Sequence, residues 1–506
     1  MQPIRLKLKV SQIPRIFCIF AFCVPHILSS AAIYPPGGKA GTTIEATISG
    51  NLDSWPAEFH LNFDGVKIEP KEKKGEVIIT IAKDAQAGPR LIRALTVKGV
   101  SDPFFFVVSD QPEILEVEPN NRLDEAQEIK NIPVVLNGKL EKNGDTDFYK
   151  IHLEKGFRFS ARLDAYSLMS PIDAFIHIYE PHGYEVAVAS DTHNLDPLLL
   201  YTVKETGVHT LQVLAVPAKA STGISYYGTA DSVYRLALGE DSLPLAPKSR
   251  FQEKEAPESL PVPSSVSGSL SMPGEIDTFR VIVPKRDQVT IRVEAQTLHY
   301  PTDPVLLVFT SPGSLLKETD DDPNRKSPDP EYLLRSGMDE PYLIQVTDRF
   351  GHGGDRYHYR LVLEKPEPSF LPVVVKDTFN ATPGKDVEIK VMLNRSNGHK
   401  LPLHATLPGI PEGFQVKGYT IAPDAKFANL KLTPLAGAPP GNHPFRIVIL
   451  EDTIGSPVAI QANFSLQTNE SRGDYLTNET PWVWVTVPNP APKDEKKSKQ
   501  EQPKEQ

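Results

Sequence analysis

Two short segments of the chain combine carboxylate and amide side chains in a pattern that suits a hard cation. Residues 116–121 read Glu-Val-Glu-Pro-Asn-Asn, and their two glutamates, two positions apart, project to the same side of an extended backbone. Residues 144–147 read Gly-Asp-Thr-Asp and repeat this spacing with aspartates. Calcium takes six to eight oxygen ligands from carboxylates, Asn side chains and carbonyls. The candidate calcium ligands are therefore Glu116, Glu118, Asn120, Asn121, Asp145 and Asp147.

The alternative interpretation of these residues is structural. Asn120 and Asn121 would form Asx turns, and the aspartates would cap a solvated turn. A second, looser copy of the pattern offers Glu253, Glu255, Glu275 and Asp277, but Ala256-Pro257 follows its glutamates. This copy lacks both asparagines, which weakens the case for calcium there.

The elements that must position these residues are predicted to be strands. Apolar residues alternate with polar ones along most of the chain, as in Ile44, Ala46 and Ile48, and this period of two is typical of half-buried strands. Proline, at 48 of 506 residues, is nearly twice its usual share of about 5%, which favours short strands joined by turns. The sequence predicts an all-β protein, a tandem array of four β-sandwich modules of Ig-like or jelly-roll-like type.

An internal repeat defines the two central modules. Residues 144–149 recur as residues 274–279, and the same offset of 130 positions links Asp173 to Asp303 and Asp191 to Asp321. We expect β-sandwiches over residues 113–240 and 250–365, with an Ig-like module over 32–112 and another over 366–488.

The two ends of the chain are predicted to lie outside these modules. Residues 1–31 have a basic leader, a short apolar stretch and small residues at the end, which is the pattern of an export signal peptide. Both cysteines, Cys18 and Cys23, belong to it. Residues 489–506 are rich in Pro, Lys, Glu and Gln and predict a disordered, charged tail. We expect a secreted or periplasmic protein with no membrane span.

The same motifs resemble those of the bacterial pre-peptidase C-terminal domain, a family similar to the collagen-binding domain of clostridial collagenases. The resemblance rests on residues 116–121, 144–149 and 207–213, where His209 replaces the usual aromatic residue. It covers two copies and about half of the chain. The flanking modules look like the Ig-like modules of planctomycete-type secreted proteins. The family implies a β-sandwich, export and attachment to secreted peptidases, and in the collagen-binding relatives calcium lies between such a segment and such a turn.

Composition and motifs also narrow the function. The net charge of −10 argues against nucleic acid as a partner, and the signatures of zinc peptidases, serine hydrolases and phosphate-binding loops are missing from the sequence. Tyr226 and Tyr227 are predicted to bind a ligand by stacking on a polymer, with packing of their own loop as the alternative.

We therefore expect an exported, non-catalytic binding or scaffold protein, with an extracellular polysaccharide or another protein as its partner. The alternatives are a secreted hydrolase, or its accessory subunit, and a purely structural envelope or adhesion protein.

Overall fold

The structure is a computed structural model that describes residues 31–50, 52, 54–192, 194–219, 225–311, 313–322, 327–417, 419–451, 458–468 and 471–489. Every regular element in this part of the chain is a strand or a three-residue 3-10 helix, which confirms the predicted all-β class. Among these residues no helix has the length and apolar character needed to cross a membrane. The predicted signal peptide, apart from its last residue, and the predicted tail, apart from Asn489, lie outside the described residues.

Module 1, residues 31–109, is a sandwich of two sheets with strand orders β1-β3-β6-β5 and β2-β9-β7-β4, and β8 pairs with β7. Alternation buries one face of each strand, so that Ala46, Ile48, Ile79 and Phe106 meet in one core. Its strands are β1 (Ile33–Tyr34), β2 (Gly37–Lys39), β3 (Thr43–Ile48), β4 (Glu58–Leu61), β5 (Val66–Pro70), β6 (Glu76–Ile81), β7 (Gly88–Thr96), β8 (Gly99–Val100) and β9 (Phe104–Ser109).

Module 2, residues 113–240, stacks the sheet β10-β12-β19-β14-β17 on the sheet β11-β13-β18-β15-β16. The inward residues of both sheets, among them Tyr149 and Leu236, form its core. Its elements are β10 (Glu113–Leu115), η1 (Leu123–Glu125), β11 (Gln127–Ile129), β12 (Val134–Lys139), β13 (Asp147–Leu153), β14 (Arg158–Asp164), η2 (Tyr166–Leu168), β15 (Ile172–Tyr179), β16 (Glu185–Ala189), β17 (Leu198–Thr202), β18 (Gly207–Pro217) and β19 (Val233–Glu240).

Module 3, residues 251–364, repeats this plan with the sheets β20-β21-β28-β23-β26 and β22-β27-β24-β25 around a separate core. Its elements are β20 (Phe251–Gln252), η3 (Glu253–Glu255), β21 (Ser264–Ser269), β22 (Ile276–Val281), β23 (Gln288–Glu294), η4 (Gln296–Leu298), β24 (Pro304–Phe309), β25 (Leu315–Thr319), β26 (Glu331–Arg335), β27 (Tyr342–Asp348) and β28 (His358–Glu364).

Module 4, residues 369–487, packs a nine-stranded sheet, with β33 and β34 at the ends of its main path, on the three-stranded sheet β30-β40-β36. Its strands are β29 (Ser369–Val374), β30 (Thr378–Asn380), β31 (Val387–Ser396), β32 (Leu403–Thr406), β33 (Phe414–Lys417), β34 (Thr420–Ile421), β35 (Phe427–Pro434), β36 (Gly441–Phe445), β37 (Ile447–Glu451), β38 (Val458–Ser465), β39 (Glu479–Thr480) and β40 (Val483–Val487).

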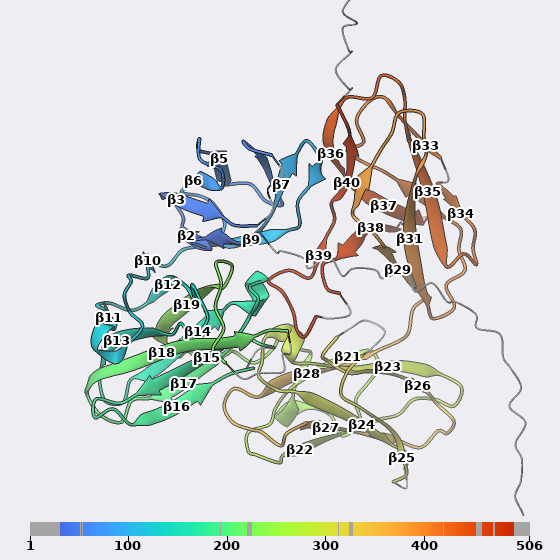
Figure 1. The fold of residues 1–506 in the computed structure, drawn as a ribbon. Helices are drawn as coiled ribbons and strands as arrows, with labels where there is room; N and C mark the ends of the chain where they lie inside the picture. Colours follow the sequence, from blue (N-terminus) through green and yellow to red (C-terminus); the bar gives the residue numbers. More distant parts are fainter. Residues whose placement is uncertain are drawn as a thin grey trace, which may run out of the picture.

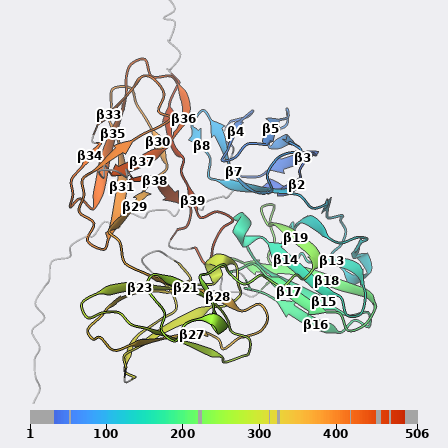
Figure 2. The same ribbon diagram turned by 180° about the vertical axis from the view of Figure 1, so that it is seen from behind.

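The four modules do not lie in a straight line, because the chain turns back on itself and brings its last module against its first (Figures 1 and 2). Arg93 of module 1 forms a buried ion pair with Asp377 of module 4. His60 of module 1 packs edge-on against Trp482 and Trp484 of module 4, with ring centroids 5.0 and 4.8 Å apart. Trp482 and Trp484 therefore both contribute to the contact between modules 1 and 4, and Trp484 is buried in it.

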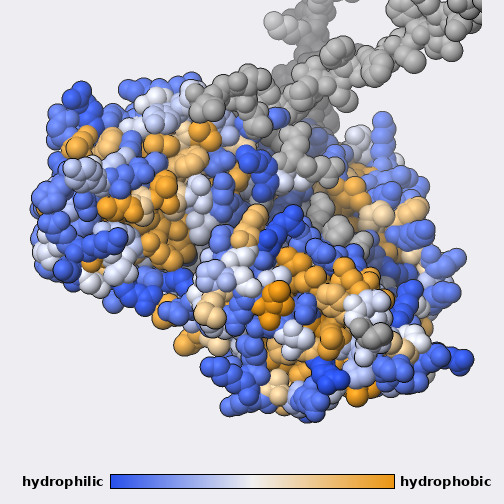
Figure 3. Space-filling view, turned by 90° about the horizontal axis from the view of Figure 1, so that it is seen from below, coloured by the Kyte–Doolittle hydropathy of each residue, from blue (hydrophilic) through white to orange (hydrophobic). Residues whose placement is uncertain are grey.

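The outer surface of modules 2 and 3 is mixed in character. Seen from below, hydrophobic residues gather in more than one patch, separated by hydrophilic residues (Figure 3). Exposed apolar side chains there include Tyr184 and Val188 in module 2 and Ile276 and Ile282 in module 3.

Candidate metal site

The candidate site lies where the chain of module 2 crosses from one sheet to the other. β10 pairs in parallel with β12 in the first sheet, and β11 pairs in parallel with β13 in the second. The crossing segment, residues 116–126, joins them over the open edge of the sandwich. A hydrogen bond of 2.9 Å from the backbone N–H of Phe148 to the carbonyl of Asn120 ties its middle to β13. Sequence-distant glutamates and aspartates are thereby brought together.

Three carboxylates converge at this crossing. Glu118, Asp145 and Asp147 each offer one oxygen, and these oxygens lie within 4.8 Å of one another. Asp145 accepts a hydrogen bond of 2.6 Å from the backbone N–H of Glu141 on its Oδ2, and Asp147 accepts one from the hydroxyl of Tyr234 on its Oδ2. The Oδ1 atoms of both aspartates are buried and have no hydrogen-bond partner in the described structure. Each aspartate is thus oriented by one oxygen and leaves the other available.

Two amide side chains complete the group. Asn120 is fully buried, and neither its Oδ1 nor its Nδ2 has a hydrogen-bond partner among the described residues. Asn121 donates its Nδ2 to Glu118 at 3.2 Å, while its Oδ1 is also buried without a partner. A buried amide with no partner costs about 1–3 kcal/mol, so this arrangement is unfavourable unless something else binds there.

The pKa values of the clustered carboxyls are raised, as expected for acidic groups that are buried together without a counter-ion. Burial, followed by the charge of Glu116, holds the pKa of Asp147 well above its usual range. Burial also raises the pKa of Glu118, and the charges of Asp145 and Glu141 add to this shift. A cation placed among these carboxylates would reverse both effects, because an opposite charge favours the ionised form.

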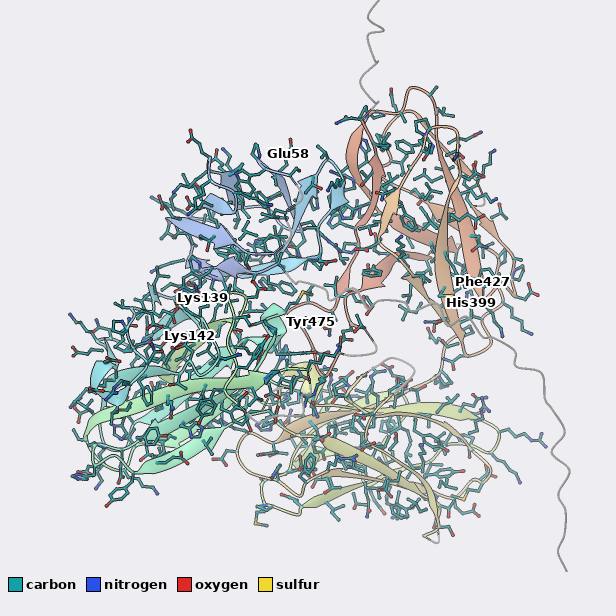
Figure 4. The ribbon with its side chains drawn as sticks, viewed as in Figure 1. Glu58, Lys139, Lys142, His399, Phe427 and Tyr475 are labelled. Atoms are coloured by element: carbon teal, nitrogen blue, oxygen red, sulfur yellow. The ribbon has the colours of Figure 1, made fainter. Side chains whose placement is uncertain are left out.

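Glu116 has a different role from the one that its spacing predicts. Its Oε2 accepts a hydrogen bond of 2.8 Å from the backbone N–H of Lys139, and its Oε1 accepts one of 3.1 Å from the hydroxyl of Tyr34 in module 1. Burial raises the pKa of Glu116 to about 8. Both oxygens are therefore engaged, and Glu116 joins the cluster to module 1; Figure 4 labels Lys139 and Lys142 at this end of module 2.

The donor set fits calcium. Glu118, Asp145, Asp147, Asn120 and Asn121 supply only oxygen as acceptor atoms, and water would complete a shell of six to eight ligands. Zinc, which prefers nitrogen and sulfur ligands, suits this set less well. A bound calcium ion would supply no chemistry of its own here; it would fix the crossing segment to the turn before β13.

The second copy of the pattern forms a different structure in module 3. Glu253 and Asp277 share a hydrogen bond, and burial, followed by the charge of Asp277, raises the pKa of Glu253 to about 7. Tyr359 donates a hydrogen bond of 2.6 Å to Asp277, as Tyr234 does to Asp147. Glu275 instead accepts a hydrogen bond of 2.9 Å from the backbone N–H of Met272 in its own turn. The two carboxyls thus contact each other directly, and the asparagines of module 2 have no counterpart in this segment.

The tyrosine pair of the sequence prediction divides between two environments. Tyr227 is partly buried and packs against the core of module 2. Tyr226 is 48% exposed, and its carbonyl accepts a hydrogen bond of 3.1 Å from the backbone N–H of Gly144 in the acidic turn. Of the two, only Tyr226 presents a surface to a ligand, and it does so beside the candidate metal site.

Sequence reasoning missed three tyrosines that support the site. The hydroxyls of Tyr149 and Tyr234 hydrogen-bond each other in the core, and Tyr34 belongs to another module. A usable signal existed for Tyr234, because the repeat places Tyr359 at the matching position. In both copies a glycine faces this ring: a Cβ on Gly138 would lie 2.2 Å from Cζ of Tyr234, and one on Gly268 would lie 2.2 Å from Cζ of Tyr359.

Comparison with protein families and with curated proteins does not identify a family for this chain. No family model matches the chain, and no curated protein matches it. The resemblance to the pre-peptidase C-terminal domain therefore stays a prediction.

Among solved structures, domains 4 and 5 of the S-layer protein SbsC are 17% identical over 24% of this chain and 63% of theirs, with a TM-score of 0.14. Domains 1–6 of SbsC are 10% identical over 86% of this chain and 54% of theirs, with a TM-score of 0.15. The fibronectin(III)-like modules of Clostridium thermocellum CbhA are 14% identical over 40% of this chain and 90% of theirs, with a TM-score of 0.11. Scores this low carry no inference about function.

Proposed function

We propose that the protein is an exported, non-catalytic scaffold that binds one calcium ion in module 2. The single observation that carries the calcium proposal is the fully buried and unpartnered side chain of Asn120 beside three converging carboxylates. In a purely structural turn, the amide side chains would form hydrogen bonds within the protein. In a cation site, their oxygens lack such partners until the ion binds. Calcium would pin the crossing segment, which also holds the junction with module 1 through Glu116 and Tyr34.

The scaffold part of the proposal is supported by how the carboxylates are used. Their oxygens accept hydrogen bonds from backbone N–H groups and from tyrosine hydroxyls, among them that of Tyr34 in module 1, which fixes the crossing segment and its junction with module 1. The partner would be an extracellular polysaccharide or another exported protein, and exposed Tyr226 is the residue that we would test first for contact with it. The alternative is a hydrolase or its accessory subunit, which would show turnover on a peptide or glycan library.

Thermal unfolding of the mature chain, with excess EDTA and with about 10 mM calcium, tests the calcium proposal. Extracellular calcium modules bind with dissociation constants of about 10⁻⁴–10⁻³ M. At the tighter limit, calcium stabilises its module by about 2.7 kcal/mol, which raises the midpoint by about 10 °C for a module of this size. Only the transition of module 2 should move.

Two variants give this experiment its controls. Asn120→Ala should reduce the calcium-dependent shift without lowering the midpoint in EDTA, because the amide that it removes is unsatisfied when no ion is bound. Glu255→Gln, at an exposed position of module 3, should alter neither. If the parent protein shows no shift, the cluster is a structural turn and the calcium proposal is wrong.

A further inference from the structure

A second surface on module 2, formed by residues other than those of the metal site, is covered by a segment of module 4. Residues 471–478, which we call the clasp, lie between β38 and β39 and reach across to the η2 turn of module 2; Figure 4 labels its Tyr475 at this junction. Beside the clasp, Leu466 at the end of β38 is buried together with Leu91 and Phe105 of module 1 and Leu168 of module 2. Three modules therefore meet at one point.

Arg472 makes the polar contacts of the clasp. Its guanidinium donates a hydrogen bond of 2.9 Å to the carbonyl of Ala218 and lies 3.4 Å from Oδ2 of Asp173. The side chain of Asp173 is only 9% exposed, and burial, followed by the charge of Asp191, raises its pKa. A positive charge from module 4 thus compensates an acidic pair of module 2.

Tyr475 and its neighbours make the apolar contacts. Its ring stacks on Tyr166 of η2, with centroids 5.5 Å apart, over a small buried group that includes Leu195 and Ala218. The backbone N–H of Arg472 donates to the hydroxyl of Tyr166 at 2.8 Å. The backbone N–H of Leu476 donates to the carbonyl of Ser167 at 2.9 Å. These contacts engage all three kinds of group that η2 presents: a ring, a hydroxyl and a carbonyl.

The clasp is ordered by its own side chains before any contact with module 2 is counted. Asp474 accepts hydrogen bonds from Gln467 at 2.8 Å and from Asn478 at 2.7 Å. The backbone N–H of Tyr475 donates to the side-chain oxygen of Asn478 at 2.9 Å. Gly473 passes so close to module 2 that a Cβ there would lie 2.4 Å from Cβ of Asn194. A preorganised segment of this kind loses little conformational entropy when it docks.

Module 3 shows what the same turn looks like without a clasp. Its η4 turn occupies the position of η2, with Gln296 in place of Tyr166, and its Thr297 is exposed where Ser167 is buried. Gln296 donates to Asp303 at 3.0 Å, so the aspartate that corresponds to Asp173 is satisfied within its own module. Tyr166 and Asp173, whose side chain has no hydrogen-bond partner among the described residues of module 2, are therefore features of a surface built to be covered.

We infer that the η2 surface of module 2 is a recognition site for an Arg- and Tyr-bearing segment, and that the clasp is its occupant within the same chain. Modules 1 and 4 are joined separately by the buried pair of Arg93 and Asp377. Docking of the clasp closes the four modules into one body. Its release removes these contacts between modules 2 and 4, so that modules 2 and 3 can move relative to module 4 at the linkers 110–112 and 365–368 and at the junction of Glu116 with Tyr34.

Distance measurement between two spin labels tests this closure. The mature chain contains no cysteine if residues 1–31 are removed, so Lys155→Cys in module 2 and Lys400→Cys in module 4, both exposed positions, give one labelled pair. Pulsed electron resonance should give one narrow distance in the parent. The double variant Arg472→Ala/Tyr475→Ala should broaden and lengthen it, and X-ray scattering should show a larger radius of gyration.

Two further variants keep the test decisive. Gly473→Ala removes no contacting group and should open the chain through its clash with Asn194 alone, whereas Gln296→Ala/Leu298→Ala on the matching turn of module 3 should leave the distance unchanged. Circular dichroism confirms that the modules of each variant stay folded.

A narrow, parent-like distance in both clasp variants would overturn the inference. Concentration-dependent dimers of the parent, abolished by the same variants, would also overturn it, because the occupant would then come from a second copy.

Discussion

Modules 2 and 3 share one scaffold but differ at the edge where the chain crosses between sheets. In both modules, a tyrosine hydroxyl donates a hydrogen bond to an aspartate near the start of a strand. The pairs are Tyr234 and Asp147 in module 2, and Tyr359 and Asp277 in module 3. In both, a glutamate of the crossing segment accepts a backbone N–H from the strand beside it. The core arrangement is therefore independent of any cation.

The difference lies in the length of the crossing segment. In module 2, thirteen positions separate Glu116 from Ile129, whereas in module 3 only seven separate Glu253 from Leu260, which pairs with the equivalent strand. The shorter segment has no room for the loop that carries the asparagines in module 2. Glu253 then bonds directly to Asp277. The proposed cation site is therefore an addition to a scaffold that both modules share.

Removing a carboxylate from the acidic cluster of module 2 should have the largest effect. Asp147→Asn keeps an acceptor for the hydroxyl of Tyr234 but removes one of three negative charges from the cluster. A hundredfold weaker affinity would reduce the calcium-dependent shift in unfolding midpoint from about 10 °C to about 2 °C. Asp277→Asn, the matched change in module 3, should leave the calcium response intact; equal losses in both variants would contradict the distinction between the modules.

Transferring the longer crossing should create a second site. Replacement of residues 254–259 by the sequence of residues 117–128, together with Glu275→Asp, gives module 3 the full donor set on a scaffold that already holds Asp277. Calorimetric titration should then find two calcium ions per chain in place of one. If the graft folds and still binds one ion, the ligands depend on features outside the crossing segment.

Loss of the contact between modules 1 and 2 should have a smaller effect. Tyr34→Phe removes the hydroxyl that donates to Glu116 and should destabilise the junction by about 1 kcal/mol, the usual net contribution of one hydrogen bond. Urea unfolding followed by fluorescence measures this loss. Calcium binding should persist, since Glu116 is not among the three converging carboxylates.

The smallest effect concerns pH in module 3. The pKa of Glu253 is about 7 in the folded chain and about 4.5 when unperturbed, so the folded state binds more protons between these values. Stability from this group is full below about pH 4.5 and is lost as the pH rises through 7. Because Glu253 is partly exposed, solvent screening weakens this dependence. In EDTA, the unfolding midpoint of module 3 should therefore fall only slightly between pH 5.5 and pH 8, and Glu253→Gln should flatten the change.

Much of the fold was accessible from the sequence because strand alternation is a local signal. The alternation predicted an all-β protein, and the structure confirms it. Glu118, Asp145 and Asp147 were predicted as ligands because two short segments each carry a pair of carboxylates two positions apart, and the structure brings these three residues together. The role of Glu116 was missed, since its partner Tyr34 lies 82 positions away in another module. In the sequence, module 3 looked like a copy in which other residues replaced the asparagines. The strand register of the folded chain shows instead that its crossing segment is shorter.

The most direct test of the account is the number of calcium ions bound by the mature, EDTA-treated chain. Isothermal titration calorimetry at pH 7.5 should find one ion per chain, and none in Asp145→Ala/Asp147→Ala. Zero ions in the parent would contradict the cation site itself. Two ions would contradict the comparison between the modules, because the short crossing of module 3 would then bind calcium without the asparagines.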